Sequence, residues 1–361
     1  MPIRARPPYD ARPPPNPDAP PPWTKTGSLL APEPSPQQLG FPLPFGRVLL
    51  WKKEPELYDA NTGVWRKTSA RPACADPPVA WERLARIPDE IVFAIGAKCG
   101  YDAEHDAWVP VPHFDVHGPG FAVTQLAKGH VLVTGGGEAL APRKEAFRWD
   151  SDTKEVAPLT LGEARTMHDA IRLLDDTVLI TATSAGAKME LFVPSAGAFR
   201  SLGPQEYDGE SALLEDGRVL FLAKGKCGLY DPSNASWLAC PPMNVPRVPH
   251  TFTITAIRGD RALVTGGRAE SDVGQALDLA EIYDPHDDVW LDVLAMPIAR
   301  AGHVAVPLLD GRVVIVAGVT GVASVEGADG AAGGAAVGEA FLYTPELPPK
   351  PPPLPPSADA D

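Results

Sequence analysis

The sequence has no long hydrophobic run. Its apolar stretches are far shorter than the ~18 residues that a membrane-crossing helix needs, so we expect no membrane insertion. An excess of positive charge is also missing, because 46 acidic residues outnumber 32 basic ones and leave a net charge of −14. A protein that binds nucleic acid needs a basic surface to neutralise phosphates, and this composition argues against one. No stretch keeps a convincing apolar period of 3.6 residues, so helices should be few.

Cysteine is scarce, with only Cys74, Cys99, Cys227 and Cys240 in the chain. Their spacings are not those of a zinc site. Cys227 and Cys240 are placed symmetrically about an expected turn, so they should face each other across a hairpin as a disulfide or as two buried thiols. The first ten residues contain arginines but no apolar segment after them, so we expect a cytoplasmic protein. Secretion is the alternative if the natural N-terminus is missing.

Proline is abundant, but it is concentrated at the two ends. Residues 1–44 contain 15 of the 43 prolines, and residues 345–361 contain 8. Proline fixes φ and removes a hydrogen-bond donor, so such stretches disfavour packed structure. The sequence therefore predicts disordered tails at 1–21 and 346–361, with one large domain at 22–345 between them.

A short β-branched run recurs seven times in that domain. The copies begin at Arg47, Ile91, His130, Thr177, Arg218, Arg261 and Arg312. An aromatic residue with a turn signal behind it follows each copy, at Tyr58, Tyr101, Trp149, Phe192, Tyr230, Tyr283 and Tyr343. Four antiparallel strands per unit, at a period of about 40 to 60 residues, are typical of a β-propeller blade.

A third element, most often tryptophan, follows the aromatic in the first six units: Trp65, Trp108, Val156, Phe199, Trp237 and Trp290. The seventh unit lacks it, and the prolines after Tyr343 cannot continue a sheet. The segment that begins at Trp23 resembles the missing outer strand. We therefore expect residues 22–29 to pair beside Phe341–Tyr343 and close the ring.

The complete pattern resembles the kelch repeat family. The best copy combines Arg247-x-x-His250, Gly266-Gly267, Tyr283-Asp284-Pro285 and Trp290. The resemblance covers about residues 23–345 and implies an all-β, seven-bladed kelch-type β-propeller, with six blades as the second choice. It departs from the family where the double glycine is lost, as at Thr181-Ala-Thr in the fourth unit.

Three Arg-x-x-His copies are the first candidate ligand site. They are Arg165 with His168, Arg247 with His250, and Arg300 with His303. In similar kelch proteins these positions serve mainly the structure. The alternative interpretation is a positive site near the mouth of the central channel that captures an anionic ligand.

A second candidate is a metal site at His113, Asp115 and His117. Alternation places the three side chains on one face of an extended segment, and imidazole with carboxylate suits Zn, Fe or Mn. The alternative is a polar surface loop. We expect no cofactor, with a transition metal here as the exception.

Some propellers similar to the kelch family are copper-radical sugar oxidases, which need two tyrosines, two histidines and a cysteine joined to one tyrosine. Only Tyr207 lies inside the fold outside a repeat position, so this site cannot be assembled in the usual way. No nucleophile elbow or phosphate loop is present either.

We therefore predict a monomeric, non-enzymatic binding scaffold that uses the loop face and the channel mouth for a protein or glycan partner. A sugar-directed enzyme, similar to a sialic-acid mutarotase or a divergent galactose oxidase, is the alternative. A channel-mouth pocket with converging arginine, histidine and carboxylate groups would favour the enzyme. The loop at 319–338, rich in glycine and alanine, is expected on the same face.

Overall fold

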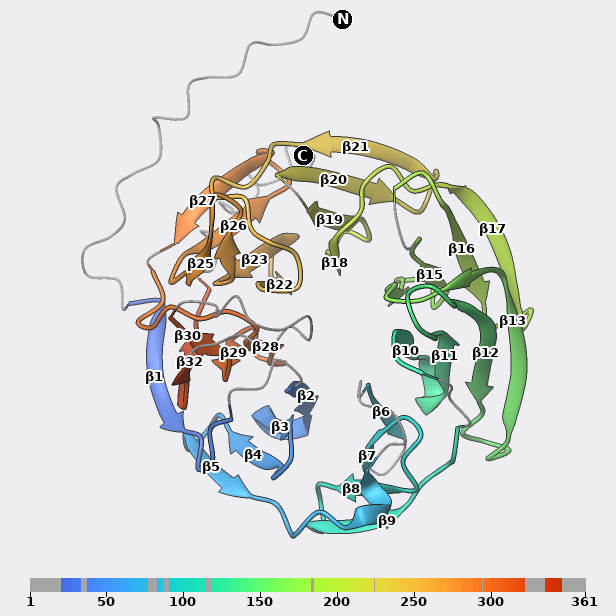
Figure 1. The fold of residues 1–361 in the computed structure, drawn as a ribbon, viewed down its shortest axis with the longest axis horizontal. Helices are drawn as coiled ribbons and strands as arrows, with labels where there is room; N and C mark the ends of the chain where they lie inside the picture. Colours follow the sequence, from blue (N-terminus) through green and yellow to red (C-terminus); the bar gives the residue numbers. More distant parts are fainter. Residues whose placement is uncertain are drawn as a thin grey trace, which may run out of the picture.

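Seven four-stranded antiparallel sheets stand around a central axis in the computed structural model (Figure 1). The structure describes residues 21–33, 38–76, 83–87, 91–114, 118–182, 185–223, 225–293, 295–321 and 335–345. The all-β, seven-bladed prediction is thus confirmed, and the six-bladed alternative is wrong. The predicted tails fall outside the described residues, apart from Pro21, and so does most of 319–338.

The strands follow the chain in order around the ring. The first three blades contain β2 (Leu39–Leu43), β3 (Arg47–Trp51), β4 (Glu56–Asp59), β5 (Val64–Lys67), β6 (Leu84–Ile87), β7 (Ile91–Ala94), β8 (Cys99–Asp102), β9 (Ala107–Pro110), β10 (Phe121–Gln125), β11 (Val131–Gly135), β12 (Arg143–Trp149) and β13 (Val156–Arg165). Blades four and five contain β14 (Ala170–Arg172), β15 (Val178–Ile180), β16 (Lys188–Val193), β17 (Ala198–Pro204), β18 (Glu210–Leu213), β19 (Val219–Ala223), β20 (Lys226–Asp231) and β21 (Ser236–Cys240).

The last two blades carry short extra hairpins. Blade six contains β22 (Thr253–Ile257), β23 (Arg261–Thr265), β26 (Ala280–Asp284) and β27 (Val289–Val293), with β24 (Arg268–Ala269) and β25 (Asp272–Ala276) between its second and third strands. Blade seven contains β28 (Val304–Pro307), β29 (Val313–Val316) and β32 (Glu339–Tyr343), with β30 (Val319–Thr320) and β31 (Ala335–Ala336) inserted likewise. Three 3-10 turns complete the described elements: η2 (Pro44–Gly46), η3 (Ala73–Ala75) and η5 (Ala127–Gly129).

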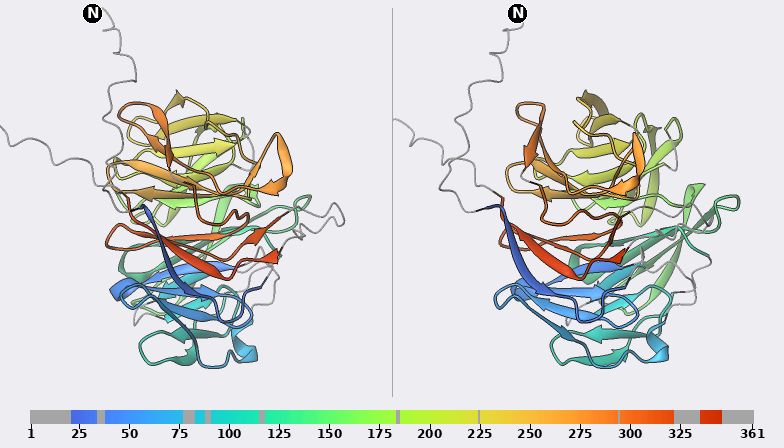
Figure 2. Two further views of the ribbon diagram at one scale, coloured as in Figure 1. Left: turned by 90° about the vertical axis from the view of Figure 1, so that its left-hand side faces the viewer. Right: turned by 60° about the vertical axis from the view of Figure 1, so that its left-hand side comes forward.

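The N-terminal strand β1 (Trp23–Ser28) closes the ring as the fourth strand of blade seven. Trp23 pairs with Tyr343 and Thr24 with Leu342, so the strand lies beside Phe341–Tyr343 as the sequence predicts. In both side views β1, in blue, runs beside the red strands of blade seven (Figure 2). The closure leaves no free sheet edge between the first and last blades.

The repeated aromatic and the tryptophan face each other on the two outer strands of a blade. Trp108 Nε1 also donates a hydrogen bond to the carbonyl of Ser69 (3.1 Å), and Trp290 Nε1 donates to the carbonyl of Pro241 (2.8 Å). Ser69 and Pro241 each lie just after the last strand of the preceding blade, so the hydrogen bond from the indole joins two neighbouring blades. The cross-strand pairs are Tyr58↔Trp65, Tyr101↔Trp108, Trp149↔Val156, Phe192↔Phe199, Tyr230↔Trp237 and Tyr283↔Trp290.

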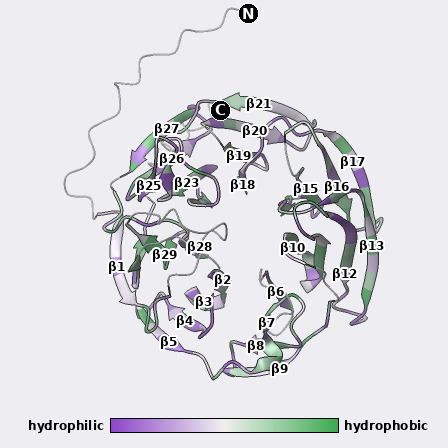
Figure 3. Cartoon of the chain, viewed as in Figure 1, coloured by the Kyte–Doolittle hydropathy of each residue, from purple (hydrophilic) through white to green (hydrophobic). Residues whose placement is uncertain are grey.

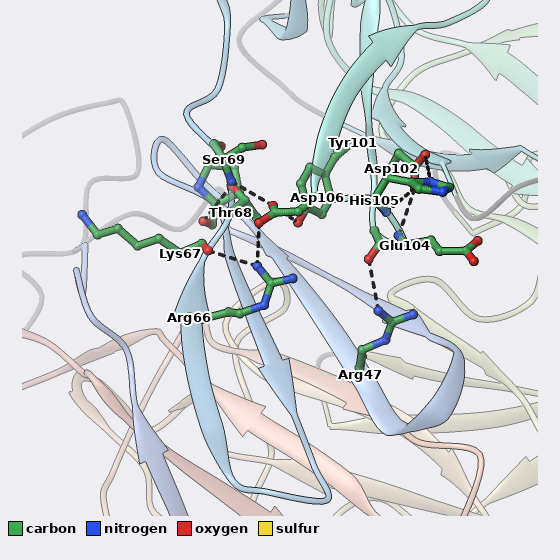
Figure 4. A network of polar contacts seen from close by, with 12 residues as sticks. Arg47, Arg66, Lys67, Thr68, Ser69, Tyr101, Asp102, Glu104, His105 and Asp106 are labelled. Carbon is green, nitrogen blue, oxygen red and sulfur yellow. Dashed lines mark hydrogen bonds and ion pairs between the residues drawn. The ribbon is translucent and has the colours of Figure 1, made fainter.

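A polar network joins blades one and two at the ring's outer side (Figure 4). Asp106 accepts hydrogen bonds from the Tyr101 hydroxyl (2.6 Å) and from the Ser69 amide (3.0 Å). Arg66 approaches the other oxygen of Asp106 at 3.0 Å. Tyr101 therefore binds the hairpin turn of its own blade through Asp106, and Asp106 in turn binds the preceding blade through Ser69 and Arg66.

The core lies between the blades. The second strands are almost wholly buried, as in β3, β11 and β29, and Figure 3 draws β29 in the hydrophobic colour. Side chains on both faces of each sheet pack against the neighbouring blades, which explains the continuous apolar runs of the sequence. Within the described part of the chain, no helix has the length and hydrophobicity to cross a membrane.

All four cysteines form disulfides. Cys227 and Cys240 pair across β20 and β21, as the hairpin symmetry allows. Cys74 binds Cys99 and so ties the link between blades one and two to β8. The sequence did not predict the second bridge, because Cys74 lies in an irregular connection whose position no repeat fixes.

Candidate functional site

Two kinds of connection lie on one face of the ring. They are the links between the second and third strands of each blade and the links from one blade to the next. We call this side the pocket face. The tight hairpins of each blade lie on the opposite side, which we call the turn face.

Three charged residues reach the pocket face at the same level of the innermost strands. Glu210 pairs with Leu222, and the carbonyls of Arg83 and Asp169 accept hydrogen bonds from the amides of Ile95 and Thr181. These three partners occupy equivalent places, three residues after the valine that pairs with the repeat aromatic. The propeller thus brings Arg83 of blade two, Asp169 of blade four and Glu210 of blade five to the mouth of one channel.

A cavity of about 320 Å³ lies at this level. It draws on blades two, four, five and six, and its wall combines charged groups with Met167 and Pro249. The residues that line it are Arg83, Met167, His168, Asp169, Thr181, Ala182, Asp208, Gly209, Glu210, Pro249 and His250. We call it the channel-mouth cavity.

Asp169 is the most perturbed carboxyl group of the cavity. Water reaches its side chain through the channel, yet the surrounding blades enclose it, and this burial raises the pKa of Asp169 above its ordinary value. The hydroxyl of Ser211 donates a hydrogen bond to Asp169, which acts in the opposite direction, while the charge of Glu210 raises the pKa further. Burial also lowers the pKa of Arg83, and the charge of Asp169 partly offsets that effect.

His250 and Glu210 form the second pair of the cavity. Glu210 Oε1 accepts a hydrogen bond from the backbone amide of His250 (2.7 Å) and lies 2.8 Å from its Nδ1. The hydrogen bond to this carboxylate raises the pKa of His250, against a smaller effect of burial. Asp169 and Glu210, two of the three carboxylates that line the cavity, thus lie in different surroundings, which is a common arrangement for acid–base chemistry.

Two residues of the cavity have strained backbones. Met167 has φ 53° and His250 has φ 61°, in the left-handed region that non-glycine residues avoid. Gly302 stands where Met167 stands, two residues after the arginine of the same motif, with φ 59°. A large side chain at such a place is a frequent mark of functional sites.

The arginines of two Arg-x-x-His motifs pair with carboxylates on the third strand of the blade that follows the motif. Arg165 Nη2 lies 2.7 Å from Glu190 Oε1, and Arg247 Nη1 forms an ion pair with Glu281. Each arginine is almost completely buried. Each carboxylate also accepts a hydrogen bond from a backbone amide that precedes the motif: Glu190 from Gly162 and Glu281 from Asn244. The ion pairs therefore bind the chain that enters the blade to the blade's third strand.

Arg300 is buried without a carboxylate partner among the described residues. It donates to the carbonyls of Ala317 (3.2 Å) and Glu339 (3.3 Å), and its guanidinium lies 5.4 Å from the centre of the Phe341 ring. Burial lowers the pKa of Arg300 to about 10. Of the six residues in the expected anion site, only His168 and His250 line the channel-mouth cavity, so anion capture by the three arginines stays a prediction.

Arg83, Asp169 and Glu210 are site residues that sequence reasoning missed. No motif marks them, because they belong to different blades and lie far apart in the chain. Their common signal is positional: each stands at the start of an innermost strand, where the other blades have Leu39, Ala122, Thr253 and Val304. An alignment of the seven repeats on the β-branched run would have shown the three charges at one level.

Only one residue of the expected metal site lies among the described residues. His113 is exposed, whereas Asp115 and His117 lie outside the described residues. A different group, His130 with Asp150 and Asp152, has potential ligand atoms within 4.8 Å of one another on the turn face. His130 Nδ1 already accepts the amide of Ser151 at 2.8 Å, so this group stabilises a turn.

Comparison with known proteins gives a fold and no family. No family model matches the chain, and no curated protein sequence matches it. A fungal alcohol oxidase of the AA5 family, solved in complex with copper, has a similar structure, with a TM-score of 0.63 and 12% identity. The match covers 90% of this chain and 75% of the oxidase. At this identity the similarity shows a shared kelch-like propeller fold.

The described residues do not fit a copper-radical centre. All four cysteines are in disulfides, so no thiol is left to join a tyrosine. Tyr207 packs beside Trp237, with ring centres 5.6 Å apart. The tyrosines at repeat positions are all buried inside blades: Tyr58, Tyr101, Tyr230, Tyr283 and Tyr343.

Proposed function

We propose that the channel-mouth cavity binds a small polyhydroxylated ligand, a monosaccharide or the terminal unit of a glycan. The observation that carries the proposal is the convergence of Arg83, Asp169, Glu210 and His250 from four blades on one cavity. Its volume of about 320 Å³ suits one sugar unit, since ligand pockets begin at roughly 300 Å³.

The charges of the cavity support a neutral ligand. Arg83 and Asp169 act on each other electrostatically, and His250 lies against Glu210. Each cation thus has an anion beside it, and Asp208 adds a third carboxylate, so the wall has no excess of positive charge for an anionic ligand. Sugar hydroxyls both donate and accept hydrogen bonds, so they match this surface better than a strongly charged ligand does.

A sugar-directed enzyme is the second candidate function. The specific observation in its favour is that arginine, histidine and three carboxylates converge, with the pKa of Asp169 and the pKa of His250 both displaced. Turnover would appear by NMR as faster exchange between sugar anomers or as a new product. A scaffold would bind the sugar without either change.

The binding test uses D-glucose, D-galactose, N-acetyl-D-glucosamine and N-acetylneuraminic acid, followed by saturation-transfer NMR and calorimetry. We expect a neutral sugar to bind best and Asp169→Asn to weaken it about tenfold, the loss of one charge-assisted hydrogen bond. Asp176→Asn is the matched control, because Asp176 lies in the same blade on the turn face, paired with Arg172. Equal binding by both variants, or no binding by the wild type, would reject the proposal.

The disulfides bear on the compartment. Bridges such as Cys74–Cys99 and Cys227–Cys240 form in oxidising surroundings. We therefore favour secretion, the alternative that the sequence left open, and mass spectrometry of the unreduced native protein tests it.

A further inference from the structure

Met167 contributes an exposed apolar side chain to the wall of the channel-mouth cavity. It lies two residues before Asp169, where the chain enters the innermost strand of blade four. The strand pairings give the same place in other blades to Gly120, Asp208, Thr251 and Gly302. Among these five described residues Met167 is the large apolar one, and it is 47% exposed.

Hydrogen bonds fix the backbone on both sides of Met167. Its own amide donates to the carbonyl of Gly120 (2.7 Å), and the hydroxyl of Thr166 donates to the carbonyl of Gly137 (2.7 Å). On the other side, the side chain of His168 is buried between the blades. The segment is therefore held in one conformation, with the side chain of Met167 left at the cavity.

This conformation is one that favours glycine. Gly120 and Gly302 occupy the equivalent place with φ 73° and 59°, and Met167 has φ 53°. A left-handed φ is unfavourable for a residue with a Cβ atom, and exposure of an apolar side chain to water adds to that cost. Strain of this kind is found where the side chain has a function. The strain and the exposure together indicate that Met167 contacts a ligand.

The wall of the cavity combines apolar groups with carboxylates. Pro249 and Ala182 add further apolar surface, while Asp169 and Asp208 offer hydrogen-bond acceptors. Asp208 stands in the next blade at the place that Met167 has in blade four. A hydroxyl group held against Met167 would lose its partner in water, which is unfavourable. A well-matched ligand therefore presents an apolar group with a hydrogen-bond donor beside it.

We propose that Met167 makes the cavity specific for a neutral 2-acetamido sugar, whose acetyl methyl group packs against the thioether side chain. This specificity rests on the proposed function. An acetamido group combines a methyl group with an N–H donor, and the donor suits a carboxylate such as Asp208. Methionine suits the methyl contact, because its unbranched, polarisable side chain adapts to the shape of a ligand.

The size of the preference follows from the groups that are added. Burial of one methyl-sized group changes affinity about fourfold. N-acetyl-D-glucosamine should therefore bind about fourfold more tightly than N-formyl-D-glucosamine, which lacks only that methyl group. D-glucose also lacks the amide, so the preference over D-glucose should be about tenfold. N-acetylneuraminic acid carries the acetamido group too, but its own carboxylate would meet the three carboxylates of the wall.

The first experiment measures the affinities of the wild-type chain for these sugars and for L-fucose by calorimetry. We expect N-acetyl-D-glucosamine to bind best. Equal affinity for N-acetyl-D-glucosamine and D-glucose would overturn the specificity and leave the proposed function standing. Tighter binding of L-fucose, whose methyl group has no amide beside it, would overturn the specificity in the same way. If no sugar binds, the proposed function fails and the specificity fails with it.

The second experiment assigns the preference to one side chain. Met167→Gln keeps the length of the side chain but makes it polar, whereas Met167→Leu keeps it apolar. Leu174→Gln is the matched control, because Leu174 is an exposed apolar residue of the same blade on the turn face. The fourfold preference for the acetyl over the formyl sugar should vanish in Met167→Gln and persist in the other two variants. A preference that survives in Met167→Gln overturns the role of Met167.

The third experiment observes the contact itself. The chain has five methionines, of which Met189, Met243 and Met296 are buried. NMR of protein with 13C-labelled methionine methyl groups follows them, and Met167→Leu assigns the signal of Met167. Saturating N-acetyl-D-glucosamine should shift that signal and give a nuclear Overhauser effect to the acetyl methyl group. A Met167 signal that stays unchanged while calorimetry shows binding would overturn the contact and leave the proposed function standing.

Discussion

The junction into blade six differs from the junctions into blades four and seven, although all three carry Arg-x-x-His. Two of the histidines are buried against a threonine of the preceding blade, and the third faces the channel. The difference arises in the connection into blade six, which has two more residues between its arginine and the innermost strand, so that Phe252 and not His250 takes the buried place and packs with Leu222. One motif position can therefore serve the fold in one blade and face the channel in another, depending on the length of the connection that follows it.

The arginines of the three motifs differ less in burial than in their partners. All three are buried, but Arg247 has a buried carboxylate partner, whereas the described partners of Arg300 are carbonyls and an aromatic ring. All three arginines are buried in the fold, whereas one of the three histidines, His250, is exposed. Arg247 in particular is fixed in its place, since removal of a buried cation from its carboxylate is costly.

The largest expected effect is on the two arginines. Arg247→Met should lower the free energy of unfolding by about 3–5 kcal/mol, because Glu281 stays buried without its cation. Arg300→Met leaves carbonyls unsatisfied and should lose only about 1–2 kcal/mol. Urea denaturation measures both, and Arg247→Met with Glu281→Leu should recover much of the loss. Equal losses for the two single variants would contradict the assigned partners.

The next largest effect is on the pH dependence of stability, in which the buried histidines and His250 should differ. Burial lowers the pKa of His168 and of His303 to about 3, so below pH 6.5 the unfolded chain takes up protons that the folded protein refuses. Their stabilisation is complete above pH 6.5 and is lost towards pH 3, by about 2 kcal/mol for each histidine at pH 5. His250 has the opposite sign: its raised pKa stabilises the fold at low pH, and that contribution disappears as the pH rises.

Urea denaturation between pH 5 and 8 measures this difference. His303→Gln should flatten the fall in stability at low pH, and His250→Gln should steepen it slightly. A variant of either histidine that leaves the pH profile of the wild type unchanged would contradict these assignments.

The sequence predicts the fold well because propeller repeats carry local signals. Turn residues, β-branched runs and the Tyr–Trp register act within one blade, and the seventh copy's missing tryptophan pointed to Trp23. The candidate site is different, since Arg83, Asp169 and Glu210 meet only after the ring closes. Each is an ordinary surface residue within its own repeat, and only the register among blades gives it a role.

The smallest expected effect concerns Met167, which occupies the place that Gly302 has in the junction into blade seven. A left-handed φ costs a non-glycine residue about 1 kcal/mol, so Met167→Gly should leave stability unchanged or raise it by up to that amount. The same change removes an apolar wall of the channel-mouth cavity and should weaken binding of the best sugar. Gly302→Met, the converse substitution outside that cavity, should lower stability by about 1–2 kcal/mol and leave sugar affinity unchanged. Thermal unfolding and calorimetry measure both quantities, and a Met167→Gly protein that is less stable but binds as the wild type does would mean that Met167 serves the fold and not the site.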